Sequence, residues 1–257
     1  MDRTDFEKGW ELLSAMAPGQ PEALTAGLAG IAPDMARLVI SFGYGEVLSR
    51  PGLDLKSRQT ATVAALAAMG GVREQLRFHI GAALMVGVTP EEIVEIIYLV
   101  VVFAGFPAGL NALAVAGEVF ADRGVKPGPV KPYADQTSRR ERGLAALEAT
   151  SKGAGRAVLE SLADIAPALG EFILDFSYGD IIARQVLSPR HKEITMIAVA
   201  AASGTMRPQL KVHLSAGLAV GIERAEIVEV LIQMAGYAGF PAALNALSAA
   251  REVFEGQ

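Results

Sequence analysis

Two histidines occupy equivalent places in a stretch of sequence that occurs twice. His79 lies in LRFHIGAAL and His213 lies in LKVHLSAGL, at an offset of 134 residues. The small residues that follow each histidine leave space beside the ring, and imidazole titrates near neutral pH. Each histidine is therefore either a satisfied, partly buried side chain or a group that transfers protons. The third, His191, has Arg190 and Lys192 beside it in the first turn of an expected helix, and we expect it to be solvated.

A carboxylate precedes the second histidine by 20 residues. It belongs to Glu193, at the start of an apolar segment, and its repeat equivalent is Gln59. If Glu193 points inward, it is a desolvated carboxylate with a raised pKa, which suits proton transfer. If it points outward, it complements the positive end of a helix dipole. The sequence leaves both interpretations open.

Acidic and basic residues recur four positions apart after each Tyr-Gly pair. Arg50 follows Glu46, and Arg184 follows Asp180. This spacing gives a helix-surface ion pair, or it places the arginine at a pocket rim where its guanidinium binds a substrate carboxylate. The candidate substrate-binding residues are Tyr44, Glu46, Arg50, Tyr178, Asp180 and Arg184. The histidines lack a ligand partner four residues later, and no acidic cluster has ligand spacing, so we expect no metal site.

The sequence as a whole occurs twice. Residues 5–121 align without a gap with residues 139–255, and the segment 122–138 between them is rich in proline, glycine and charge. We therefore expect two domains, 1–121 and 139–257, joined by a flexible linker at 122–138. Thr89-Pro90 and Ser188-Pro189 have the N-cap and first residues of helices. No stretch alternates with period two, so the sequence predicts an all-α protein.

Composition excludes several classes of function. The net charge of −5 gives no field for nucleic acid or an anionic membrane. The absence of cysteine excludes disulfides, thiolate metal sites and a thiol redox cycle. The N-terminal MDRTDFEKGW has no apolar signal-peptide core, so we expect a cytoplasmic protein. The uncharged runs 96–117 and 230–250 are each interrupted by Gly-Phe-Pro, which favours buried helices with a bend over a membrane span.

Three motifs resemble one family. YGEVLSRPGLD (44–54), EQLRFHIGAALMVGVTPEEIVEI (74–96) and FAGFPAGLNAL (103–113) are similar to the 4-carboxymuconolactone decarboxylase family, whose wider group includes the alkylhydroperoxidase D-like proteins. The resemblance recurs in each half and implies two tandem helical domains that form a fused pseudo-dimer. The peroxidase branch depends on a Cys-x-x-Cys pair before the histidine, so a thiol peroxidase is excluded. Glu193 matches a glutamate typical of that branch, whereas the first half is closer to the decarboxylase.

The resemblance implies a decarboxylase of aromatic-compound degradation that needs no cofactor and no metal. In a carboxylated unsaturated lactone, the electrons released with CO2 pass to the lactone carbonyl, so the substrate is its own electron sink. Arg50 or Arg184 would hold the carboxylate. His79 or His213, the latter with Glu193, would return a proton to carbon. A related lyase or isomerase acting through an enolate would use the same groups. The alternative is a non-enzymatic small-molecule-binding or assembly protein.

The resemblance also implies an assembly. Single-domain relatives form hexamers of paired protomers, and in this chain the pair is already covalent. Three chains would supply six domains, so we expect a homotrimer whose large apolar faces are subunit contacts.

Overall fold

The computed structural model describes residues 4–134 and 136–256, and every element within these ranges is helical. The first repeat forms α1 (Asp5–Met16), α2 (Gln20–Leu28), α3 (Pro33–Leu38), the π-helix η1 (Val39–Leu48), α4 (Leu55–Met69), α5 (Arg73–Met85) and α6 (Pro90–Asp122). The second repeat forms α7 (Arg139–Thr150), α8 (Lys152–Ser161), α9 (Pro167–Phe172), the π-helix η2 (Ile173–Ile182), α10 (Pro189–Ser203), α11 (Arg207–Ala219), α12 (Arg224–Tyr237) and α13 (Phe240–Glu255). The all-α prediction is confirmed.

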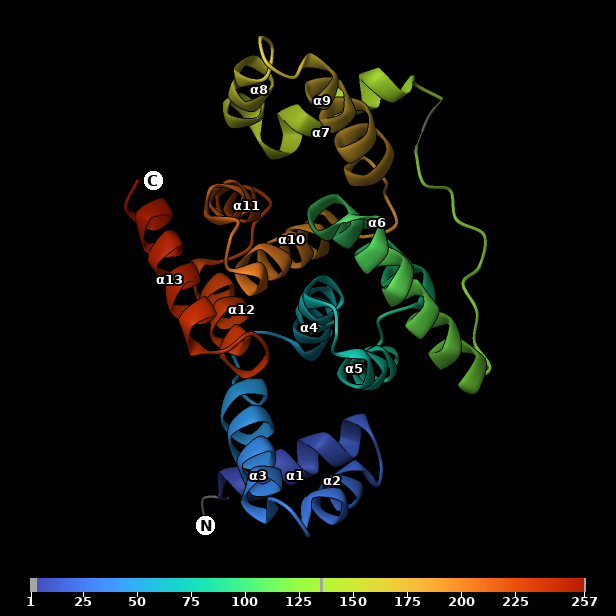
Figure 1. Cartoon of the computed structure of the whole chain (residues 1–257), viewed down its shortest axis with the longest axis vertical. Helices are drawn as coiled ribbons and strands as arrows, with labels where there is room; N and C mark the ends of the chain where they lie inside the picture. The colour runs from blue at the N-terminus through green and yellow to red at the C-terminus, as the bar shows by residue number, and fades with distance from the viewer. Residues whose placement is uncertain (1–3, 135, 257) are drawn as a thin grey trace.

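The two repeats share one hydrophobic core. α4 packs against α10 in the middle of the molecule, and α5, α6 and α11–α13 surround this pair (Figure 1). Residues 57–67 of α4 and 193–201 of α10 are buried without interruption, because neighbouring helices cover every side of both. One cluster of buried apolar side chains includes residues of both repeats. The chain is therefore a fused pair of domains built around a common centre.

A small group of helices packs at each end of this central body. We call α1–α3 with η1 the first cap and α7–α9 with η2 the second cap; they lie at opposite ends of the molecule (Figure 1). Each cap starts with a capping box, formed by Thr4 with Glu7 and by Ser138 with Glu141. The first cap has a separate apolar core that includes Leu13, Met16, Ile40, Tyr44 and Leu48.

Glycines let the helices of each cap approach closely. In the first cap, a Cβ on Gly9 would overlap the carbonyl oxygen of Ile40, and a Cβ on Gly45 would overlap that of Asp5. The second cap repeats this arrangement at Gly143 and Gly179. Only glycine fits where one backbone rests directly on another, which explains why the Tyr-Gly motif occurs in both repeats.

We expect Gly45→Ala to destabilise the protein, because the added methyl group meets backbone rather than a movable side chain. Overpacking of this kind costs about 1–3 kcal/mol, and the free energy of unfolding is measured by urea titration. Gly43→Ala, two residues away in the same π-helix, is the matched control, since its Cβ would meet no atom within 4 Å. Equal unfolding midpoints for the two variants would show that the cap relaxes around the methyl group.

The Gly-Phe-Pro sequence bends the chain in both repeats, as the sequence predicts. Gly105 has a φ of 84° inside α6, two residues before Pro107. The equivalent Gly239 has a φ of 89° and separates α12 from α13. Among the described residues, α6 is the one helix long and apolar enough to cross a membrane, with a hydropathy of 2.2 in its most apolar window. It is bent at Gly105 and packs against α4, α5 and α10.

The segment between the repeats runs as an extended strap from α6 to α7 (Figure 1). The carbonyl oxygen of Pro132 accepts a hydrogen bond from the backbone N–H of Gln185 at 2.8 Å. The hydroxyl of Tyr133 donates to the carbonyl oxygen of Asp180 at 2.8 Å, and the guanidinium of Arg142 stacks 3.9 Å from the Tyr133 ring. Part of the predicted linker is therefore held against the second cap.

Candidate active site

His79 is held by a buried amide in the first repeat. Gln59 on α4 and His79 on α5 are both buried, and Nδ1 of His79 lies 2.9 Å from Oε1 of Gln59. With the carbonyl oxygen facing it, Nδ1 carries the hydrogen and donates to Gln59. The other ring nitrogen, Nε2, then bears the lone pair. This arrangement fixes both the orientation and the tautomer of the imidazole.

Aromatic side chains from both repeats enclose the same imidazole. The ring of Phe78 lies 4.9 Å from that of His79, and the ring of Tyr237 on α12 lies 5.2 Å away, both edge-on. Burial lowers the pKa of His79 to about 3, so the ring is neutral at neutral pH. Burial also raises the pKa of Tyr237 to about 12 and that of Tyr44 above its usual range, which keeps both hydroxyls protonated. The group combines a neutral base with phenolic hydrogen-bond donors.

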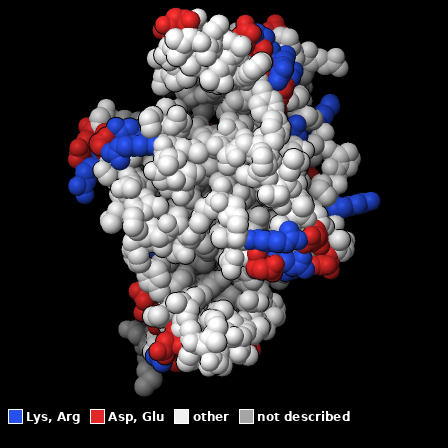
Figure 2. All heavy atoms as spheres, viewed as in Figure 1, with Lys and Arg blue, Asp and Glu red and all other residues white. Residues whose placement is uncertain are grey.

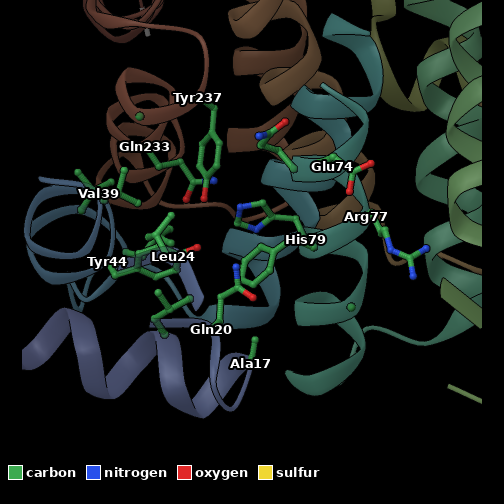
Figure 3. A pocket seen from close by; sticks show the side chains of 18 of the residues that line it. Ala17, Gln20, Leu24, Val39, Tyr44, Glu74, Arg77, His79, Gln233 and Tyr237 are labelled. Carbon is green, nitrogen blue, oxygen red and sulfur yellow. The ribbon is translucent and has the colours of Figure 1, made fainter. Parts of the chain in front are cut away.

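A cavity of about 1010 Å³ opens beside His79. Its walls come from the first cap, from α5, from the end of α6, and from Gln233, Tyr237 and Phe240 of the second repeat. Figure 3 shows the His79 ring between Tyr237 on one side and Tyr44 and Gln20 of the first cap on the other. The pocket is thus assembled from both halves of the chain, and neither repeat alone would enclose it.

The second repeat has a different histidine pair. Nδ1 of His213 on α11 donates to the Glu193 carboxylate on α10 over 2.9 Å, and both side chains are buried. Glu193 therefore points inward, which decides between the two orientations that its sequence position allows. Phe103, the repeat equivalent of Tyr237, lies edge-on to the His213 ring at 5.4 Å. A carboxylate here takes the place of the neutral Gln59 amide.

The cavity of the second repeat does not reach its histidine. It measures about 570 Å³, and its lining residues include Ser151, Ala154, Lys211 and Ser215. The repeat equivalents of these four residues all line the first cavity. His213 is not among its lining residues. Tyr178, the equivalent of Tyr44, is hydrogen-bonded through its hydroxyl to Ser151 Oγ at 2.6 Å. The structure therefore places His79, but not His213, at the wall of a large cavity.

The two predicted arginines bind protein carboxylates of the opposite repeat. Nη2 of Arg50 lies 2.9 Å from Glu229, and Nη2 of Arg184 lies 2.6 Å from Glu95. Glu95 and Glu229 are themselves repeat equivalents, so the two ion pairs are reciprocal links between the halves. Buried Arg58 adds a second contact to Glu229 at 2.9 Å.

These ion pairs change the interpretation of the surrounding residues. The helix-surface pairs considered from the four-residue spacing do not form, because the arginines turn toward the other repeat. Asp180 instead contacts Arg139 at 2.6 Å, and Glu46 is exposed. Arg50 and Arg184 line neither of the two cavities described above. Of the six candidate substrate-binding residues, only Tyr44 lines the larger one.

His191 is only partly solvated, whereas we expected it to be fully so. It is half-buried where α4 meets α10, with Nδ1 3.0 Å from Ser188 Oγ and Nε2 3.5 Å from Ser57 Oγ. Burial lowers its pKa, and Lys56 adds to this. Ser57 is its repeat equivalent, so the two residues meet near the pseudo-twofold axis. Among the described residues, no group of three or more His, Cys, Asp or Glu is arranged to hold a metal ion.

The comparisons with known proteins agree with the repeated fold. The carboxymuconolactone decarboxylase family matches residues 33–118 and again 167–252. The 4-carboxymuconolactone decarboxylase of Acinetobacter baylyi (strain ATCC 33305 / BD413 / ADP1) is 40% identical over 94 residues, 37% of this chain and 69% of that protein. An uncharacterized 15.0 kDa protein in the nqo9-nqo10 intergenic region of Paracoccus denitrificans is 31% identical over 118 residues, 46% of this chain and 88% of that protein.

A solved structure resembles the chain over nearly its whole length. It comes from Burkholderia xenovorans LB400 and is provisionally described as a gamma-carboxymuconolactone decarboxylase subunit. The TM-score is 0.59 at 26% identity, covering 92% of this chain and 98% of that chain. Fold and site together define a tandem all-α protein with one buried, hydrogen-bonded histidine at the equivalent position of each repeat. The chain belongs to the carboxymuconolactone decarboxylase family and contains two copies of the family domain.

Proposed function

We propose that the protein is a cofactor-independent carboxy-lyase, or a related lyase or isomerase, that acts on an enolisable small-molecule acid in the first-repeat cavity. One observation carries the proposal: a neutral, oriented imidazole and two protonated phenols lie together at the wall of a large cavity. The family membership supports a decarboxylase-like role.

The reaction would release the carboxylate as CO2. The electrons of the broken C–C bond pass through the conjugated system to a carbonyl oxygen, which becomes an enolate. Tyr44 or Tyr237 donates a hydrogen bond to this oxygen and stabilises the charge that develops there. Because Arg50 and Arg184 bind Glu229 and Glu95, these two arginines are not assigned to the substrate.

His79 would complete the reaction by moving a proton. The free imidazole is neutral, because burial opposes its charged form. An enolate beside the ring favours the charged form, so Nε2 takes up a proton from solvent water as the enolate appears. The imidazolium then passes this proton to carbon and returns to its neutral state. The same neutral ring would remove a proton from carbon in an isomerase.

The test is a reaction in D2O with 4-carboxymuconolactone and with larger enolisable carboxylic acids, followed by NMR. A carboxy-lyase releases one CO2 per turnover and leaves one deuterium on the product carbon. An isomerase exchanges deuterium without releasing CO2. Binding without either change would contradict the proposed chemistry and support the alternative, a protein that retains the fold only to bind a small molecule.

A further inference from the structure

The first-repeat cavity is much larger than a single-ring lactone requires. At about 1010 Å³ it lies at the upper end of the range for small-molecule pockets, about 300–1,000 Å³. The aromatic rings of Phe42, Phe78, Tyr237 and Phe240 line it. We infer that this cavity takes a bulky, planar and largely apolar acid of more than one ring, with an anionic group at Arg123. This inference rests on the proposed function only in assuming that the ligand is an acid.

Small residues keep the first cavity open. Gly43, Gly81 and Gly236 line it. A Cβ on Gly43 or Gly236 would meet no atom within 4 Å, so the backbone there faces open space. The repeat equivalents of the three glycines are all larger: Ser177, Ser215 and Val102.

The second repeat therefore serves as an internal comparison. It has the same helices with larger side chains at these positions, and its cavity is about 570 Å³ and does not reach His213. The two cavities therefore differ in volume although equivalent helices form both repeats, and Ser215 lines the second cavity where Gly81 lines the first. A ring system large enough to fill the first cavity would not fit the second, so the inference assigns the ligand to one site per chain.

Arg123 supplies the contact for an acidic group. Its Nη2 atom lies 2.9 Å from the position that a Cβ on Gly81 would occupy, so the guanidinium rests over α5 at the cavity wall. The neighbouring Arg77 is paired with Asp122, whereas Arg123 has no ion-pair partner in residues 4–134 and 136–256. Glu74 also lines the cavity and disfavours a carboxylate at its own part of the rim. An unpaired guanidinium beside apolar walls is suited to a planar carboxylate.

Calorimetric titration with aromatic acids tests the inference independently of any turnover. We expect anthracene-2-carboxylate to bind about 100-fold more tightly than benzoate, because its two additional rings bury more apolar surface. Arg123→Gln weakens anthracene-2-carboxylate about 10-fold but leaves the neutral anthracene-2-carboxamide unchanged. Gly236→Val introduces the side chain found at Val102 and weakens the three-ring acid at least about 10-fold by filling the cavity. Controls are Arg251→Gln, an exposed charge on α13, and Gly117→Val, an exposed helical glycine of α6.

The outcomes separate this inference from the proposed function. Equal affinities for benzoate and anthracene-2-carboxylate would overturn it, as would full affinity in Gly236→Val. Binding as expected without CO2 release or deuterium exchange from any acid tested would contradict the proposed chemistry and leave the inferred ligand class standing. Turnover of 4-carboxymuconolactone without affinity for the three-ring acid would support the proposed chemistry and contradict the inferred ligand class.

Discussion

Replacing His79 with Gln is expected to lower turnover by about 10²–10⁴-fold, which is the usual contribution of a positioned acid or base. The reason is geometric: His79 lines the large cavity, and its Nδ1–Gln59 hydrogen bond leaves Nε2 available for proton transfer. Gln has a similar size but cannot exchange protons in this pH range. The rate is measured by CO2 release or deuterium incorporation under substrate saturation.

The matched control is His213→Gln, the same substitution at the equivalent residue. His213 does not line either described cavity, so this variant keeps most of the activity at a temperature where it is folded. It loses the hydrogen bond to Glu193 and leaves a buried carboxylate without that partner, which costs about 1–3 kcal/mol of stability. Circular dichroism separates this loss of stability from a loss of catalysis. An equal fall in activity for both variants would contradict the assignment of chemistry to the first repeat.

The pH profile provides an additional test of His79. Its folded-state pKa is lowered to about 3, so the neutral base is the dominant form at every pH above that value. Activity should therefore show no loss near pH 6.5 from protonation of this histidine. A fall in kcat/KM of the wild-type protein near pH 6.5 that disappears in His79→Gln would show that the ring is more accessible to water than its burial indicates.

The sequence predicts the helices well because their signals are local. Thr89-Pro90 begins α6, Ser188-Pro189 begins α10, and the glycine of each Gly-Phe-Pro adopts the positive φ that bends the chain. The repeat itself indicates the fused pair. The histidines of the candidate site also stand out, since each occurs in the same helix of its repeat.

Contacts between the repeats are where sequence reasoning fails. Arg50 binds Glu229, 179 residues away, rather than the acid four positions before it. Tyr237, which encloses His79, comes from the opposite half, and only its place before the Gly-Phe-Pro bend could have drawn attention to it. The contrast between an open and a reduced cavity involves side chains that meet only in the folded chain, such as those around Gly81 in the first cavity and Ser215 in the second.

Exposed apolar side chains form two repeat-related patches. Each patch joins one cap to the helix that follows the bend in the other repeat, and the Phe42–Phe240 and Phe106–Phe176 ring contacts connect these parts. Patch one consists of Ile31, Met35, Leu38, Phe240 and Leu244. Patch two consists of Ile165, Leu169, Phe172, Phe106 and Leu110. Every member of one patch is the repeat equivalent of a member of the other.

Large parts of the molecular surface carry no charged side chains and could therefore form such contacts. Figure 2 shows charged side chains gathered in a few groups, with broad uncharged areas between them. The members of the two patches are 49–83% exposed in the single chain. Exposing so many large apolar side chains to water is unfavourable and usually marks a contact surface. Because a chain carries the surface twice, each copy can contact two neighbours, and three chains joined in this way would form a ring. We therefore retain the homotrimer as the expected assembly.

Disrupting both patches is expected to dissociate the protein. Light scattering of the wild-type protein should give about 81 kDa, three times the chain mass of 26.9 kDa. The double variant Leu110→Arg with Leu244→Arg should give the mass of one chain, because each arginine would place an unpaired charge in the contact. Both leucines are more than 60% exposed, so the fold of the single chain should not change.

Leu144→Arg is the matched control: Leu144 is 51% exposed but lies outside both patches, so that variant should remain a trimer. A wild-type protein that is monomeric at micromolar concentration would rule out the trimer. A double variant that remains trimeric would place the subunit contact elsewhere on the chain.

Because Met35, Leu38 and Phe240 belong both to patch one and to the wall of the cavity, a neighbouring chain seated on patch one would also lie beside the ligand. Dissociation should therefore lower the affinity for the three-ring acid as well, which links the assembly to the function of the first repeat.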